Sequence, residues 1–189
     1  MITEYLNTLE ASLRQLDQSK LATLVDLIDL STQRGGKILL FGNGGSAANA
    51  LHGATDFNMI LERIGRSSYA IGLTANIADI TRIANDDAFS KIFTNQLQQY
   101  LAPNDVVIAL STSGNSGNIV HALEFARSFD ENISTVLLTI RKDCGAARFA
   151  ELVICSEIAD TQIAEDLQQI ILHLTSRGLL EKFKVATAT

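Results

Sequence analysis

Short apolar runs recur along the middle of the chain and are separated by longer stretches of mixed polar and apolar residues. Nearly continuous apolar runs of roughly four to eight residues are typical of strands that are buried on both faces of a sheet. We therefore predict five buried strands, at Lys37 to Gly42, Tyr69 to Thr74, Asp105 to Ser111, Ser134 to Thr139 and Glu151 to Ser156.

The stretches between these runs are predicted to be helical: Ala47 to Arg63, Ile77 to Ala84, Ser90 to Leu101, Gly117 to Ser128 and a shorter one near Gly145 to Ala150. Strict alternation of strand and helix favours a parallel sheet with right-handed crossovers and helices on both sides. The predicted fold class is α/β, a three-layer α/β/α sandwich with a five-stranded parallel sheet. Open sheets of this kind bind ligands beyond the carboxyl ends of their strands.

Two leucine-rich helices flank this unit, one from Thr3 to about Gln33 and the other from Thr161 to Phe183, with apolar residues mostly three or four positions apart. Leucine-rich helices outside a five-stranded core commonly pack against another subunit, so we predict a homo-oligomer. Packing of either helix on its own sheet stays open as an alternative. The chain is interpreted as one domain, residues 1–189, in which residues 1–34 form an N-terminal helical segment used in oligomerisation.

The composition is that of one globular domain: 189 residues, 47% hydrophobic and 19% charged. The net charge of −6 and the lack of a Lys or Arg cluster disfavour direct nucleic-acid binding. No apolar run approaches the roughly 20 residues that span a bilayer, and the N-terminus does not read as a signal peptide. We expect no membrane association and a cytoplasmic location, with Cys144 and Cys155 as reduced, structural thiols.

A glycine-rich turn, GNGGSAANA from Gly42 to Ala50, follows the first predicted strand and opens a helix. Backbone N–H groups at such a turn and at a helix N-terminus can face an anion. Asn43, Gly44 and Ser46 are the candidate binding residues here. A glycine-rich turn alone is a weak signal, and a merely tight turn is an equally good interpretation.

A second turn, STSGNSGN from Ser111 to Asn118, follows the third predicted strand. Its hydroxyl groups precede another helix N-terminus, where hydroxyls and backbone amides bind phosphate with help from the helix macrodipole. A serine N-cap explains one or two of these hydroxyls, but not all four. The turn therefore predicts a phosphate site formed by Ser111, Thr112, Ser113 and Ser116.

These two motifs, with IANDDAF (Ile83 to Phe89) and Gln96, resemble the SIS (sugar isomerase) family and, within it, the phosphoheptose isomerase branch. The resemblance covers nearly the entire chain. It implies a homotetramer that interconverts sedoheptulose 7-phosphate and D-glycero-D-manno-heptose 7-phosphate for envelope polysaccharides such as lipopolysaccharide. It also implies that the sugar phosphate contacts both turns together with Asn85, Asp86 and Glu165.

The resemblance further implies a metal, usually zinc, held by a His and a Glu on the first helix and by a Gln and a His on the last. His52 and Asp56 match the first pair, with Asp in place of Glu, and their i,i+4 spacing projects both from one helix face. In the last helix, a gapless match of TQIAEDLQQIILH places Glu165 at the Gln position and His173 at the His position.

An alternative register, shifted by one residue, would put Ala164 and Leu172 at the ligand positions and abolish the metal site. We favour the gapless register because it keeps a strong ligand type at every position. Glu165 and His173 are eight residues apart, about 12 Å along a helix at ~1.5 Å per residue. Either their side chains bend toward each other, or neighbouring subunits share the site.

By the same resemblance, Asp56 is the catalytic base and His173 the catalytic acid of an enediol mechanism. The chain departs from the family pattern at Ile60, where an arginine is usual, and at Ala75-Asn76, where Thr-Asp is usual. Two other functions stay open: a non-catalytic SIS adaptor resembling the tetrameric protein that binds the bacterial replication initiator, and an isomerase or sensor for another phosphosugar.

Overall fold

The structure, a computed structural model, describes the backbone of residues 1–187 and the side chains of residues 1–184. Five strands form a single sheet in the order β2-β1-β3-β4-β5, and every pairing is parallel. The predicted α/β class and the five-stranded parallel sheet are confirmed. The strands are β1 (Ile38–Gly42), β2 (Ala70–Gly72), β3 (Val106–Leu110), β4 (Ser134–Thr139) and β5 (Leu152–Cys155).

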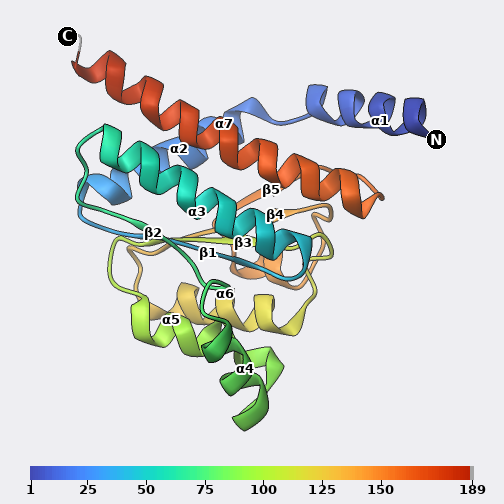
Figure 1. Cartoon of the computed structure of the whole chain (residues 1–189). Helices are drawn as coiled ribbons and strands as arrows, with labels where there is room; N and C mark the ends of the chain where they lie inside the picture. Colours follow the sequence, from blue (N-terminus) through green and yellow to red (C-terminus); the bar gives the residue numbers. More distant parts are fainter. Residues whose placement is uncertain (188–189) are drawn as a thin grey trace.

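Helices cover both faces of the sheet (Figure 1). One layer holds α2 (Gln18–Gln33), α3 (Gly45–Arg63) and α7 (Thr161–Thr187). The opposite layer holds α4 (Ile77–Asp86), α5 (Thr94–Tyr100) and α6 (Gly117–Phe129), with the short 3-10 turns η1 (Phe89–Lys91) and η2 (Ala146–Phe149).

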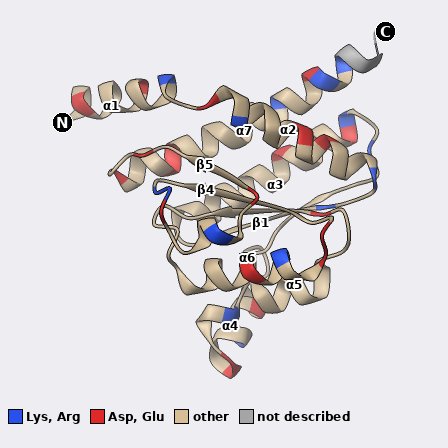
Figure 2. Ribbon diagram, turned by 180° about the vertical axis from the view of Figure 1, so that it is seen from behind, with Lys and Arg blue, Asp and Glu red and all other residues tan. Residues whose placement is uncertain are grey.

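The hydrophobic core is divided into two clusters, one on each side of the sheet. In β1, Leu40 belongs to the cluster under α3 and α7, whereas Leu39 and Phe41 belong to the cluster under α5 and α6. Successive side chains of a strand point to opposite faces, so a strand covered on both sides must be apolar at every position. The sheet is accordingly almost free of charged residues (Figure 2).

The predicted N-terminal helix from Thr3 to Gln33 is wrong as one continuous element. The chain forms α1 (Ile2–Arg14) and then α2, because the Asp17 carboxylate caps α2 by accepting hydrogen bonds from the backbone N–H groups of Ser19 and Lys20. Helix α1 projects from the body of the domain (Figure 1) and keeps Ile2, Leu6 and Leu13 exposed. Its use in oligomerisation stays a prediction.

The strand order reverses direction between β1 and β3. From β1 the chain crosses one face of the sheet through α3 to β2, which lies on one side of β1. From β3 it crosses the opposite face through α6 to β4, which lies in the other direction along the sheet. A crevice forms at such a switch point, outside the carboxyl ends of the two strands. Within residues 1–187, no helix combines the length and the hydropathy that a bilayer crossing requires.

Candidate active site

The two predicted ligand-binding turns meet at this switch point. Asn43, directly after β1, and Asn118, in the first turn of α6, exchange two amide hydrogen bonds of 3.0 and 2.9 Å. Asn118 is almost fully buried. This amide pair holds the end of β1 against the start of α6, and with it the glycine-rich turn beside the hydroxyl-rich turn.

The hydroxyl-rich turn keeps hydrogen-bond donors available. Ser111 Oγ accepts a hydrogen bond from the backbone N–H of Gly114 (3.0 Å), and Ser113 Oγ accepts one from Asn115 (3.2 Å). A hydroxyl that accepts through a lone pair still has its O–H to donate. Ser116 is the N-cap of α6, yet its side chain makes no capping hydrogen bond. These groups and the positive end of α6 together suit a phosphate dianion.

The N-terminus of α3 is also left without a side-chain cap. Gly44 precedes the helix with a φ of +56°, a left-handed conformation that favours glycine. The Glu165 carboxylate of α7 lies against Gly45, where any Cβ would overlap it. Ser46 Oγ of α3 donates a 2.8 Å hydrogen bond to Gln168 Oε1 of α7. The start of α7 therefore closes over the start of α3, and a carboxylate lies at the positive helix end.

Three predicted metal ligands converge where α3 and α7 cross. His52 and Asp56 come from α3 and His173 from α7, and one ligand atom of each lies within 4.8 Å of the other two. Asp56 Oδ2 is 3.2 Å from His173 Nε2 and 3.5 Å from His52 Nε2, and the two imidazole nitrogens are 3.4 Å apart. The i,i+4 spacing thus places both α3 side chains opposite one residue of α7.

The donor set of this cluster fits a divalent metal ion. Asp56 Oδ2 is buried and has no hydrogen-bond donor, which is costly for a carboxylate oxygen unless a cation neutralises it. Two imidazoles and a carboxylate are ordinary zinc ligands. The site borders a cavity of about 440 Å³ that is lined by the later halves of α3 and α7 and by neither turn, so Asp56 and His173 are accessible from that side.

A fourth polar group, Gln169, was missed by the sequence interpretation. Its Nε2 lies 2.9 Å from His173 Nε2, and its Oε1 is buried without a partner. Amide oxygen and nitrogen exchange places by a half-turn of the side chain, which would bring an acceptor oxygen to the cluster. Its i,i+4 spacing to His173 was the available signal, the same spacing that relates His52 to Asp56.

Close packing of the two helices fixes this geometry. Gly53, next to His52, faces Leu172, next to His173, and a Cβ on Gly53 would lie only 2.7 Å from Leu172 Cδ1. Both residues are buried between α3 and α7. The absence of a side chain at Gly53 lets the helix surfaces approach closely enough for the two histidines to meet.

Not every predicted site residue joins these groups. Glu165 is outside the His52–Asp56–His173 cluster, because it lies two helical turns before His173 and beside Gly45 instead. Its side chain does not bend to the metal cluster within one chain, and a site shared between subunits stays a prediction. Asn85 and Asp86, at the exposed end of α4, bond to each other and to neither turn among the described residues.

The two cysteines are free thiols. Cys144 is buried, and burial raises the pKa of the Cys155 thiol above its usual value. A raised pKa leaves less of the reactive thiolate at neutral pH. This environment agrees with the structural role expected for both cysteines.

Comparison with known proteins gives a consistent picture. Residues 4–137 match the family model described as SIS domain. The chain is 30% identical to a probable phosphoheptose isomerase of Thermoplasma acidophilum over 89% of its own length and 91% of that protein. It is 35% identical to a phosphoheptose isomerase of Helicobacter pylori, over 88% and 85% respectively. A phosphoheptose isomerase structure from Francisella tularensis superposes with a TM-score of 0.85 at 22% identity, covering 95% and 94% of the two chains.

Proposed function

This chain belongs to the SIS domain family, in its phosphoheptose isomerase branch, and we propose that it interconverts sedoheptulose 7-phosphate and D-glycero-D-manno-heptose 7-phosphate. The observation that carries the proposal is the 3.2 Å separation of Asp56 Oδ2 and His173 Nε2, on two different helices, beside an open cavity. Aldose–ketose isomerisation needs a base and an acid within reach of neighbouring carbon and oxygen atoms.

The proton transfers follow from these positions. The Asp56 carboxylate removes a proton from C1 of the ketose, while His173 donates a proton to the carbonyl oxygen on C2 from Nδ1, the ring nitrogen that does not face Asp56. The resulting enediol loses its O1 proton to His173, and the carboxyl group of Asp56 returns a proton to C2. Each side chain ends in its starting protonation state, so the cycle is balanced.

Other residues of the chain orient the substrate. We propose that the phosphate lies on Ser111, Thr112, Ser113 and Ser116, in the turn that leads into the start of α6. We propose that Asn43, Gly44 and Ser46 contact the sugar from the α3 side, together with Glu165. Asn85 and Asp86 are proposed as more distant substrate contacts, reached by movement of α4 or in an assembly.

A divalent metal, zinc by family resemblance, fits the cluster of His52, Asp56 and His173, with the Gln169 amide oxygen as a further ligand. When bound, it supplies polarisation of the carbonyl and hydroxyl oxygens of the sugar. The homotetramer and the cytoplasmic location remain predictions.

The decisive assay mixes purified protein with sedoheptulose 7-phosphate, with and without added zinc, and follows aldose formation by NMR. We expect conversion by the wild type, loss of conversion in Asp56→Ala, and no change in Glu62→Gln, an exposed acid on the same helix. If neither condition gives conversion and Asp56→Ala equals wild type, the proposal is wrong.

Replacement of the usual family arginine by Ile60, which is buried in the core, favours testing other substrates as well. Binding assays across five- to seven-carbon sugar phosphates would identify an isomerase or sensor for another phosphosugar. The adaptor alternative predicts no need for metal. Metal analysis of protein purified without chelator separates it from the isomerase, because only the isomerase is expected to retain an ion at His52 and Asp56.

A further inference from the structure

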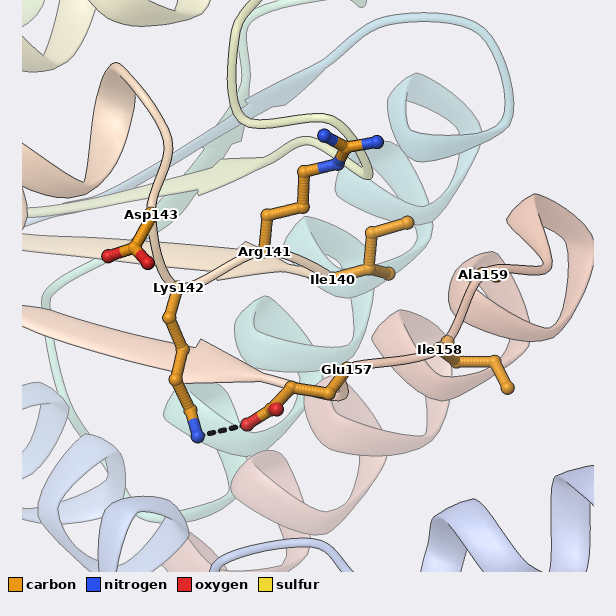
Figure 3. A pocket seen from close by; sticks show the side chains of 7 residues that line it. All are labelled: Ile140, Arg141, Lys142, Asp143, Glu157, Ile158 and Ala159. Atoms are coloured by element: carbon orange, nitrogen blue, oxygen red, sulfur yellow. Dashed lines mark ion pairs between the residues drawn. The ribbon is translucent and has the colours of Figure 1, made fainter.

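A second open cavity, of about 540 Å³, lies beyond the carboxyl ends of β4 and β5 (Figure 3). Ile140 and Ile158 give it apolar walls, and four charged side chains border it: Arg141, Lys142, Asp143 and Glu157. Its volume is in the range of roughly 300–1,000 Å³ that is usual for small-molecule sites. Because β4 is the neighbour of β3 in the sheet, this cavity is adjacent to the hydroxyl-rich turn.

One of the two cations at the cavity is already neutralised. Lys142 forms an ion pair with Glu157, drawn as the dashed line in Figure 3. The hydrogen bond to Glu157 raises the pKa of Lys142. Glu157 makes this contact from a left-handed backbone conformation, with a φ of +47°, which is costly for a residue other than glycine. The pair joins the loops after β4 and β5 and forms one wall of the cavity.

Arg141 is the other cation, and its charge is unpaired. Its guanidinium is exposed and makes no hydrogen bond or ion pair with any described residue. In Figure 3 the side chain extends away from the Lys142–Glu157 pair, on the side where the loop after β3 passes. The Asp143 carboxylate also borders the cavity, but in Figure 3 it points away from the Arg141 guanidinium. A guanidinium that has no ion-pair partner can bind an oxyanion through two parallel hydrogen bonds.

Backbone contacts hold Arg141 next to the hydroxyl-rich turn. The N–H of Ile140 donates to the carbonyl oxygen of Thr112 (3.2 Å), and Thr139 Oγ1 donates to the same oxygen (3.2 Å). The N–H of Arg141 in turn donates to Thr139 Oγ1 (3.3 Å). The chain is therefore tied to the turn at the residue immediately before Arg141.

We infer that Arg141 is a specificity-determining residue that binds the phosphate group of the sugar phosphate held by the hydroxyl-rich turn. This inference rests on the proposed function. Residues Ser111–Ser116 contain no Lys or Arg, whereas a phosphate monoester carries about −1.5 to −2 charges at neutral pH. The start of α6 supplies only about half a positive charge. Arg141 supplies a full positive charge, which would favour binding of a phosphosugar over the free sugar.

The test compares Arg141→Gln and Arg141→Lys with a matched control, Arg127→Gln, which removes an exposed arginine near the end of α6. Calorimetry measures binding of sedoheptulose 7-phosphate, inorganic phosphate and unphosphorylated sedoheptulose. We expect Arg141→Gln to weaken binding of both phosphate ligands by about 10- to 100-fold, as for loss of one charge-assisted contact. Arg141→Lys should keep part of the affinity, and the control should bind like wild type.

Kinetics give a second readout. Loss of a contact made equally in the ground state and the transition state raises KM and leaves kcat nearly unchanged, and this is the result expected for Arg141→Gln. Wild-type affinity for phosphate ligands in Arg141→Gln would overturn this inference alone. A wild-type protein that binds no phosphosugar would overturn the proposed function and this inference with it.

Discussion

Replacement of Asp56 by Asn tests the cluster between α3 and α7 most directly. Asn has nearly the shape of Asp, so the substitution removes one negative charge and one acceptor oxygen and little else. Asp56 Oδ2 lies within 3.5 Å of both imidazole nitrogens and has no hydrogen-bond donor of its own. We expect the fold to tolerate the change and the site to lose its function.

The magnitudes follow from the two roles proposed for this carboxylate, general base and metal ligand. Loss of a general base costs about 10²- to 10⁴-fold in rate. Substitution of residues that merely support metal ligands costs about 10- to 100-fold in metal affinity. Loss of a metal ligand itself should weaken metal affinity by at least the upper end of this range, about 100-fold, which corresponds to ~2.8 kcal/mol at ~1.4 kcal/mol per tenfold.

Zinc affinity is measured by competition with a chromophoric chelator, and turnover by the NMR assay. Thermal unfolding of the metal-free protein shows whether the fold is kept. Glu62→Gln, an exposed change of the same chemical kind on α3, is the control and should match wild type in all three measurements. If Asp56→Asn binds zinc as tightly as wild type and turns over at the same rate, the assignment of this cluster is refuted.

Three further predictions concern Gln169, Tyr5 and Asp105. Gln169→Ala should weaken zinc binding by about 100-fold in the same chelator competition, and unchanged affinity would exclude its amide as a ligand. The hydrogen bond to Asp166 raises the pKa of Tyr5 to about 12, so this contact between α1 and α7 should persist below pH 10 and be lost as the pH rises through 12. An ultraviolet titration should show one late-ionising tyrosine that disappears in Tyr5→Phe; an identical titration in the variant would contradict this. Asp105 is fully buried, and its carboxylate pairs with Lys37 at 2.8 Å. Replacement of Asp105 by Ala should lower the free energy of unfolding by about 3–5 kcal/mol. A urea midpoint near that of wild type would contradict this prediction.

The elements that follow from local pattern were predicted well from the sequence. The buried strands are visible because a sheet covered on both faces demands apolar residues at every position, as in β1 and β3. The division of the N-terminal helix was missed although Asp17 is a good N-cap, because the leucine spacing continues across the break and outweighed one local signal.

The site was predicted only in part, for a related reason. The spacing of His52 and Asp56 on one helix is a local property, and so is the run of hydroxyls from Ser111 to Ser116. Which residues of α7 meet α3 is decided by the crossing of the two helices, and that crossing brings His173 and Gln169 to the cluster while it leaves Glu165 beside Gly45.

The sequence by itself determined the alternation of strands and helices, the two turns proposed to bind the ligand and the types of group proposed for catalysis, because each depends on residues that are neighbours along the chain. Only the tertiary structure decided which of these groups lie together. Sheet order brings β4 beside β3 and so places Arg141 near the hydroxyl-rich turn, and close packing at Gly53 sets His52 against His173. Contacts between distant segments depend on packing and topology, which a pattern read along one strand or helix does not contain.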